Sequence, residues 1–225
     1  MRRPSRRSLP PRWTRPDPVR PDDPRHGWNS RYADAGDDYV FGTAPNAFLA
    51  AQARWLTPGQ RALSVADGEG RNGVWLAEQG LQVDAVEFAP AAIAKARRLA
   101  AARGVTPNFI EADLLTWDWP VSAYDVVAAI FIQFVGPAER ARLFACMTAA
   151  LRPGGLLLIQ GYTPRQLDYR TGGPSAVENL YTQALLRDAF AGLEILHLAE
   201  YDSHVDEGHG HRGTSALIDL IARKP

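Results

Sequence analysis

The stretch Ser64-Val65-Ala66-Asp67-Gly68-Glu69-Gly70-Arg71-Asn72-Gly73 joins a short apolar segment to an amphipathic one. Residues 62–66 predict a buried strand, and residues 72–79 predict a helix that ends at Gly80. Glycines in the turn between them let the backbone approach a ligand closely, and the first turn of the helix offers N–H groups. This order of elements predicts an α/β fold with a ligand-binding turn after the first strand.

The alternation of strand and helix patterns continues along the rest of the chain. Further strands are expected at residues 82–88, 108–112, 124–130 and 156–160, and helices at residues 45–56, 90–103, 137–151 and 178–190. The last two strands, residues 193–201 and 215–222, are joined only by a His/Gly-rich connection, residues 203–214. The prediction is a doubly wound, mostly parallel α/β sheet of seven strands with a C-terminal antiparallel hairpin.

Length and composition restrict the class of protein. The chain has 225 residues, enough for one compact domain. Lys+Arg and Asp+Glu are both 25, so the basic excess of a general nucleic-acid binder is absent and nucleic acid is not an expected partner. The single cysteine, Cys146, excludes an internal disulfide or a multi-cysteine metal site. No apolar run approaches the roughly 18 residues that span a bilayer, so no membrane contact and a cytoplasmic location are expected.

The first 25 residues differ in composition from the remainder. They hold eight arginines and seven prolines against three acidic residues. Repeated proline prevents a helix, and the few apolar residues cannot build a core. We therefore expect a disordered arm at residues 1–26 and a folded domain at residues 27–225. A nucleic-acid contact and an extension without function both remain compatible with such an arm, whereas a twin-arginine signal is excluded because no apolar segment follows Arg2 and Arg3.

Acidic residues stand at the ends of the second and third predicted strands. Glu87 follows Gly68 by 19 residues, so the glycines and this acid satisfy the fingerprint of a nicotinamide dinucleotide site. A carboxylate at Glu87 can accept both hydroxyls of a ribose. Asp113, with the backbone N–H of Leu114, complements the amino group and ring nitrogen of adenine, although an aspartate there can also cap a turn. Because ligands bind beyond the carboxyl ends of parallel strands, a nucleoside-containing ligand is predicted.

These residues resemble a known family. Residues 64–72, Glu87, residues 111–114, the strand at 124–130, Pro153-Gly154-Gly155 and the terminal hairpin are similar to class I S-adenosylmethionine-dependent methyltransferases. Residues 41–46 together with 68–72 resemble small bacterial members, akin to the tellurite-resistance and thiol-type enzymes. The resemblance covers about residues 31–223 and implies S-adenosylmethionine as the cofactor. The cofactor-binding residues that it implies are Ala66, Asp67, Gly68, Gly70, Asn72, Glu87, Phe88, Asp113, Leu114 and Ile130.

The chain departs from the family pattern at two positions. Ser64 stands where the first motif usually has an acid, and Ala66 stands where it has a glycine. Ala66 is small enough to permit the turn. Asp67 is expected to replace the missing acid by reaching the amino group of the cofactor's methionine part.

The resemblance implies methyl transfer to a small molecule. A sulfonium methyl is already electrophilic, so alignment of the acceptor and exclusion of water are the main requirements. A soft nucleophile such as a thiol or a chalcogen oxyanion needs little base catalysis, and accordingly no catalytic residue is assigned. Substrate contacts are expected from the N-terminal segment, the loops after the fourth and fifth strands and the histidine-rich connection: Tyr39, Phe41, Gln133, Tyr162, His209 and His211. Tyr32, Phe131 and Phe134 are further aromatic candidates, and for each aromatic residue a role in the core stays open.

Two other functions and a metal site are considered for the same sequence. An NAD(P)-dependent oxidoreductase would use the same glycines but would lack a second mononucleotide-binding half and leave Asp113 without a role. A non-catalytic adenosine-nucleoside-binding protein is compatible with Ser64 and Ala66. His204, Glu207, His209 and His211 have the spacing of zinc ligands, but the glycines among them argue against a rigid site, so no metal is expected and a loop covering the substrate is favoured.

Overall fold

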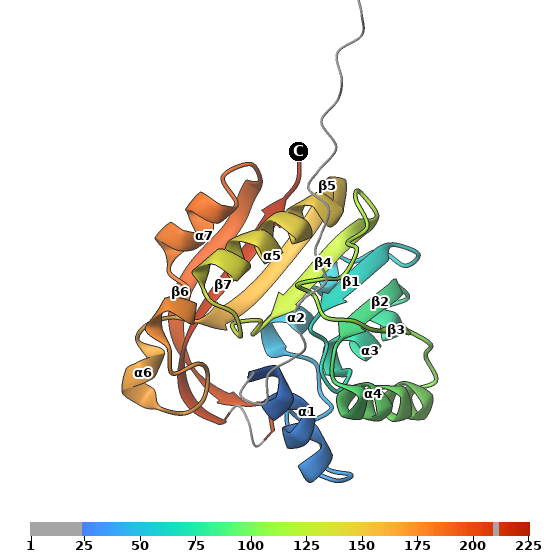
Figure 1. The fold of residues 1–225 in the computed structure, drawn as a ribbon. Helices are drawn as coiled ribbons and strands as arrows, with labels where there is room; N and C mark the ends of the chain where they lie inside the picture. The colour runs from blue at the N-terminus through green and yellow to red at the C-terminus, as the bar shows by residue number, and fades with distance from the viewer. Residues whose placement is uncertain (1–23, 209–211) are drawn as a thin grey trace, which may run out of the picture.

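The computed structural model describes residues 24–208 and 212–225. Within these residues, seven strands form one sheet in the order β3-β2-β1-β4-β5-β7-β6 (Figure 1). Neighbouring strands among β1 to β5 are parallel, whereas β7 is antiparallel to both β5 and β6. The strands are β1 (Arg61–Val65), β2 (Gln82–Glu87), β3 (Asn108–Glu111), β4 (Tyr124–Ile130), β5 (Leu151–Tyr162), β6 (Glu194–Asp206) and β7 (Arg212–Arg223). The predicted fold class is confirmed.

Helices cover both faces of the sheet, because the central strands are apolar on both sides. In β4, Val127 and Ala129 pack toward α5 (Pro137–Ala150) and α7 (Gln183–Ala189). Val126 and Ala128 point to the opposite face, where α2 and α3 lie. The helices of that face are α2 (Ala47–Ala51), α3 (Arg71–Glu78) and α4 (Pro90–Arg103), and the shorter elements are η1 (Ala53–Trp55), α6 (Gln166–Tyr169) and η2 (Val177–Asn179).

The helix limits predicted from proline, glycine and apolar spacing agree with the structure for α4 and differ from it for two other helices. The helix α4 has the predicted limits, because Pro90 begins it and Gly104 ends it in the left-handed conformation. The helix expected at residues 45–56 is instead α2 followed by the 3-10 turn η1. The helix expected at residues 178–190 begins only at Gln183, since Leu180 and Tyr181 are buried before it and Thr182 caps it by accepting from the N–H of Leu185.

The C-terminal hairpin is longer than predicted. Residues 203–214 were expected to connect two strands, but β6 continues to Asp206 and β7 begins at Arg212, with Val205 paired to Gly213. The tip of the hairpin contacts the N-terminal part of the chain. A Cβ atom on Gly208 would lie 2.6 Å from the backbone nitrogen of Gly42, so the two segments are in close contact. His209 and His211 lie outside the described residues.

The helix α1 (Pro24–Asp34) was not predicted. It begins inside the expected arm, so residues 24–26 are helical, and residues 1–23 lie outside the described part of the chain. α1 packs against α4 near the carboxyl ends of the parallel strands (Figure 1). Tyr32 and Val40 are buried there against Ala89 and Ala92 at the start of α4. None of the helices in the described residues is long and apolar enough to cross a membrane.

Candidate active site

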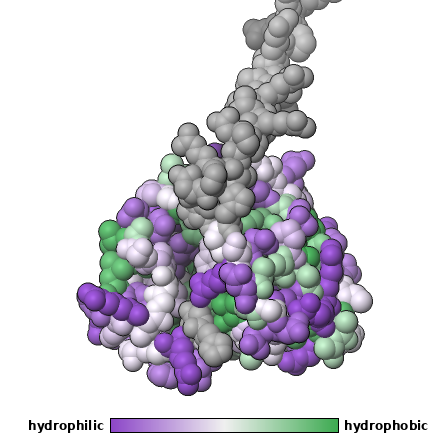
Figure 2. Space-filling view, turned by 60° about the horizontal axis from the view of Figure 1, so that its bottom comes forward, coloured by the Kyte–Doolittle hydropathy of each residue, from purple (hydrophilic) through white to green (hydrophobic). Residues whose placement is uncertain are grey.

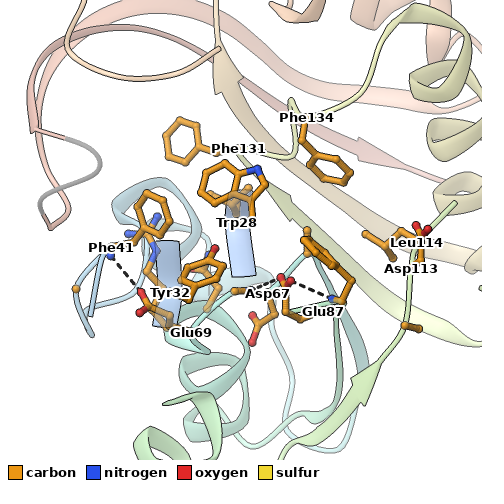
Figure 3. Close-up of a pocket in the computed structure, with 18 residues that line it drawn as sticks. Trp28, Tyr32, Phe41, Asp67, Glu69, Glu87, Asp113, Leu114, Phe131 and Phe134 are labelled. Carbon is orange, nitrogen blue, oxygen red and sulfur yellow. Dashed lines mark hydrogen bonds between the residues drawn. The ribbon is translucent and has the colours of Figure 1, made fainter. Parts of the chain in front are cut away.

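A cavity opens at the carboxyl ends of β1, β2, β3 and β4, and α1 with its following loop lies over it (Figure 3). Figure 2 brings this edge forward and shows hydrophobic residues in small patches among hydrophilic ones. Nine of the ten predicted cofactor-binding residues line the cavity. The tenth, Gly70, does not line it. The edge of the sheet that the strand order predicts for a ligand is therefore where the cavity lies.

The glycine turn has the backbone conformation that its sequence requires. Gly68 and Gly70 have φ of 61° and 92°, in the left-handed region. A Cβ atom on Gly70 would lie 2.7 Å from the Cβ of Ala96, so this glycine lets α3 pack against α4. Ala66 also adopts positive φ, at 49°, which costs a residue with a Cβ atom roughly 1–2 kcal/mol. The alanine at this position is accommodated with strain.

Glu87 connects the end of β2 to the glycine turn. Its Oε2 accepts a hydrogen bond of 2.9 Å from the N–H of Gly68. Its Oε1 accepts from the N–H groups of Phe88 and Ala89, also at 2.9 Å. Burial raises the pKa of this carboxyl, and the three N–H donors oppose that shift. Since each carboxylate oxygen can accept two hydrogen bonds, Glu87 retains capacity to accept from a ribose hydroxyl.

Asp113 lies at the end of β3 and lines the same cavity beside Leu114. Its Oδ1 accepts a hydrogen bond of 2.9 Å from the N–H of Leu115. The turn-capping role considered from the sequence is therefore present. It also fixes the carboxylate in place next to Leu114, so adenine recognition by this pair stays a prediction.

Asp67 lines the cavity beside Ser64, and its contact with the amino group of the cofactor's methionine part stays a prediction. Its Oδ1 accepts from Ser64 Oγ at 2.6 Å and from the N–H of Gly73 at 2.8 Å. Its Oδ2 has no hydrogen-bond partner among the described residues and would lie 2.7 Å from a Cβ atom on Gly73. The carboxylate thus faces the start of α3, next to the serine that replaces the family's acid. The carboxylate of Asp67, three residues after Ser64, therefore lies beside the position where the family usually has an acid.

The buried carboxyl of Asp67 gives stability a pH dependence. Burial raises its pKa from 3.8 to about 6, against the opposing hydrogen bonds of Ser64 and Gly73. The folded protein therefore holds this proton more tightly than the unfolded chain does. The contribution to stability is complete below pH 3.8 and is lost as the pH rises to about 6. The loss is roughly 3 kcal/mol, at 1.36 kcal/mol per pKa unit.

Asp67→Asn should remove this dependence, because an amide oxygen keeps both accepted hydrogen bonds and does not ionise. Urea unfolding at several pH values measures it. The free energy of unfolding of the unmodified protein minus that of the variant should fall by roughly 2 kcal/mol between pH 4 and pH 6, and the remainder should be lost above pH 6. Asp118→Asn, at an exposed position, is the control and should show no such fall. A pH-independent difference for Asp67→Asn would contradict the assignment.

A buried ion pair fastens the N-terminal segment over the glycine turn. Lys95 Nζ lies 3.0 Å from Glu69 Oε1, and both side chains are at most 3% exposed. Lys95 also donates to the carbonyl of Asp38 at 2.7 Å, and the N–H of Phe41 donates to Glu69 Oε2 at 3.3 Å. Sequence reasoning did not find this pair. A single lysine on the inward face of the Ala-rich helix α4 was the available signal.

A second ion pair fastens the C-terminal hairpin to the same turn. Arg71 Nη1, at the start of α3, lies 2.7 Å from Glu207 Oε2. The Nδ2 of Asn46 donates to Glu207 Oε1 at 3.1 Å and to Gln160 Oε1 at 2.6 Å, while its backbone N–H donates to Asn72 Oδ1 at 3.0 Å. Asn46 is 1% exposed and joins four separate segments. Glu207 thus connects the histidine-rich segment to Arg71, which lines the cavity.

Three predicted substrate residues lie outside the cavity. The hydroxyl of Tyr39 donates to the carbonyl of Lys95 at 3.0 Å, and its ring packs with Val74 and Leu99 of α3 and α4. Gln133 donates to the carbonyl of Tyr162 at 2.9 Å and accepts from its N–H at 2.6 Å. Tyr162 is 1% exposed. The amide of Gln133 thus joins its loop to β5, and the hydroxyl of Tyr39 joins its loop to α4.

The aromatic residues that do line the cavity come from two parts of the chain. Tyr32 and Phe41 lie on α1 and the loop after it, and Phe131 and Phe134 follow β4. Trp28 of α1 joins them and was missed, because α1 itself was not predicted. In Figure 3 the rings of Phe41, Phe131 and Trp28 lie on the side of the cavity away from Asp113 and Leu114, and Phe134 lies between Trp28 and Leu114. The cavity therefore has a polar end at the strands and an aromatic end beneath α1.

Comparison with known proteins finds a family model that overlaps this site. Residues 62–155, which run from β1 into β5, match the family model of a methyltransferase domain. This part of the chain is therefore similar to a methyltransferase domain. The match contains the glycine turn, Glu87 and Asp113, and it supports S-adenosylmethionine as the cofactor of the domain.

A curated relative agrees with the methyltransferase domain. The demethylmenaquinone methyltransferase of Thermus thermophilus is 36% identical over 107 residues, which are 47% of this chain and 48% of that protein. The chain thus spans about half the length of this relative.

Solved structures with the fold of the methyltransferase domain extend over most of the chain. One, from work on the conversion of a disulfide bond into a thioacetal group during echinomycin biosynthesis, has a TM-score of 0.72 and 19% identity, over 89% of this chain and 92% of that one. TehB from Haemophilus influenzae has a TM-score of 0.67 and 18% identity, over 88% of this chain and 67% of its own. At these identities the likeness is one of fold.

Proposed function

We propose that the protein transfers the methyl group of S-adenosylmethionine to a small molecule with a soft nucleophilic atom, a thiol in the first place. The observation that carries this proposal is the meeting of the Gly68 turn, Glu87 and Asp113 in one cavity, at the ends of three adjacent parallel strands. An aromatic wall faces these polar groups. The family match over residues 62–155 supports the same reading.

The residues present suit this cofactor. Glu87 would accept hydrogen bonds from the ribose, the Gly68 turn would let the ligand lie against the backbone, and Asp113 with Leu114 would hold the adenine. The bound cofactor supplies a methyl group on a positively charged sulfur. The chain's own contribution is to hold the ligand, to align the acceptor and to keep water out with the rings beneath α1.

The charged residues of the cavity favour an acceptor that needs no base from the protein. Glu69 is paired with Lys95, Glu87 accepts from three backbone N–H groups, and Arg71 is paired with Glu207. Among the described lining residues there is neither histidine nor lysine. A thiol can ionise in water before it binds, whereas an alcohol or amine needs help. A chalcogen oxyanion ranks below a thiol, because it would meet the carboxylates of Asp67, Glu69, Glu87 and Asp113.

Calorimetric titration with S-adenosylhomocysteine, with NADH run in parallel, tests the proposal first. S-adenosylhomocysteine should bind and NADH should not. Methyl transfer from S-adenosylmethionine is then measured with 2-mercaptoethanol, thiophenol and tellurite as acceptors, and a thiol should be methylated fastest. Binding of NADH alone would instead support an oxidoreductase. Binding of S-adenosylhomocysteine without turnover of any acceptor would favour a non-catalytic nucleoside-binding protein.

A further inference from the structure

The aromatic end of the cavity has two walls from elements far apart in the sequence. Trp28 and Phe41 belong to the N-terminal segment, and Phe131 and Phe134 belong to the loop after β4 (Figure 3). All four side chains are half-buried, unlike Tyr162 and Tyr181, which are at most 1% exposed. We call these four residues the aromatic slot. Its rings are positioned at the cavity and are not part of the interior of the sheet.

The slot is held in place from behind by other rings. Trp28 stacks on the buried Tyr32 with centroids 5.9 Å apart and lies 6.0 Å from Phe41. Phe131 stacks on the buried Tyr162 at 4.6 Å with an interplanar angle of 26°. Phe131 also has a positive φ of 55°, an uncommon conformation for a bulky residue. Such strain persists only where the surrounding structure holds it, and it occurs often at binding sites.

The slot offers ring faces and, within the described part of the chain, no unpaired lining cation, so the part of an acceptor that lies between its walls is an uncharged ring. Arg71 is the cation among the described lining residues, and Glu207 already neutralises it at 2.7 Å. The guanidinium of Arg31 lies over the rings of Trp28 and Phe41, at 5.1 and 5.3 Å from their centroids, and its side chain is exposed to solvent. An acceptor in the slot therefore meets ring faces, which bind flat aromatic molecules by stacking and edge contacts.

The ring of the acceptor also bears on its ionisation. The thiol of cysteine has a pKa near 8.5, and a simple alkyl thiol is less acidic still, so most of it is protonated at neutral pH. An aromatic ring attached to the sulfur delocalises the negative charge, which makes an aryl thiol more acidic. Since the described lining residues offer no histidine or lysine, an acceptor that ionises in water at neutral pH suits this site. The rings of the slot favour a flat aromatic acceptor, and the lack of histidine and lysine among the described lining residues favours an acidic thiol. An aryl thiol meets both conditions.

We propose that the aromatic slot selects a flat aryl or heteroaryl thiol as the methyl acceptor. This inference rests on the proposed function. The thiol loses its proton to water, its sulfur then bonds to the methyl carbon, and the bond from that carbon to the cofactor's sulfur breaks. The products are an aryl methyl sulfide and S-adenosylhomocysteine. Trp28 and Phe131 are the specificity-determining residues, and neither has a role in proton transfer.

Binding of inert product-like probes tests the slot without turnover. The protein loaded with S-adenosylhomocysteine is titrated with methyl phenyl sulfide and with methyl cyclohexyl sulfide, which differ in the flatness and aromaticity of the ring. The phenyl compound should bind about tenfold more tightly, as expected for one or two aromatic contacts of roughly 0.5–1.5 kcal/mol each. Thiophenol should likewise be methylated faster than cyclohexanethiol.

Substitutions test which residues cause the preference for the phenyl compound. Trp28→Leu and Phe131→Leu should each reduce the tenfold preference severalfold, and together they should abolish it. Tyr169→Leu, on α6 outside the cavity, should leave the preference unchanged. Equal binding of the two sulfides, or a preference that survives both slot substitutions, would overturn the inference while leaving the proposed function standing. Failure of S-adenosylhomocysteine to bind would overturn the proposed function and this inference with it.

Discussion

Lys95→Met is expected to lower the free energy of unfolding by about 3–5 kcal/mol, the usual cost of removing one partner of a buried ion pair. Lys95 and Glu69 are both almost fully buried and lie 3.0 Å apart. Without the ammonium, the carboxylate of Glu69 keeps the hydrogen bond from the N–H of Phe41, and the carbonyl of Asp38 loses its donor. The N-terminal segment should also detach from the glycine turn, so affinity for S-adenosylhomocysteine should fall.

Denaturant unfolding of four proteins measures this effect: the unmodified chain, Lys95→Met, Glu69→Gln and the double variant. The double variant should be more stable than Lys95→Met, because it no longer buries an unpaired charge. Arg103→Met is the matched control on the same helix. Its partner Glu78 is 3.5 Å away and the arginine is 45% exposed, so a change of at most about 1 kcal/mol is expected. Equal effects at Lys95 and Arg103 would refute the role given to the buried pair.

Glu87→Ala should weaken binding of S-adenosylhomocysteine by about 10- to 150-fold, which corresponds to roughly 1.5–3 kcal/mol for hydrogen bonds to a charged group. Two causes add. The ribose loses its acceptor, and the N–H groups of Gly68, Phe88 and Ala89 lose the carboxylate that fixes the turn. The free energy of unfolding should fall as well, because buried N–H donors are left without partners.

Calorimetry on the folded variant separates these effects from simple unfolding. Glu111→Ala is the control, since Glu111 is paired in register with Glu87 on the neighbouring strand but is exposed and does not line the cavity. It should bind S-adenosylhomocysteine like the unmodified protein. Undiminished binding by folded Glu87→Ala would contradict the position assigned to the cofactor.

Local sequence signals placed the elements that close-range interactions define. Proline at the start and glycine after the end set the limits of α4, and an uninterrupted apolar run set those of β4. Gly68 and Gly70 marked the turn because positive φ is inexpensive only for glycine. The mostly parallel sheet followed from the alternation of strands and helices, and the cavity at its carboxyl ends followed from the general rule for ligand sites in such sheets.

Other features depended on residues that are distant in the sequence. Lys95 and Glu69 are 26 positions apart, and Asn46 and Glu207 are 161 apart. Neither pair leaves a local pattern, because each residue only gains its partner when the segments pack. The same cause explains the helix α1 and the long hairpin, whose stability comes from contacts with α4 and with residues 40–42.

Features that could be predicted from the sequence differ from the others in the range of the interactions that produce them. Backbone conformation, helix capping and hydrophobic periodicity act within a few residues, so the glycine turn, the parallel sheet and the position of Glu87 and Asp113 could be read from the chain. The contribution of a charged or aromatic side chain to stability or binding depends on its burial, and burial is decided only when distant segments pack together. Thus the pairing of Glu69 and Arg71, the orientation of Asp67 and the meeting of Trp28 with Phe131 at one cavity follow from the packed structure.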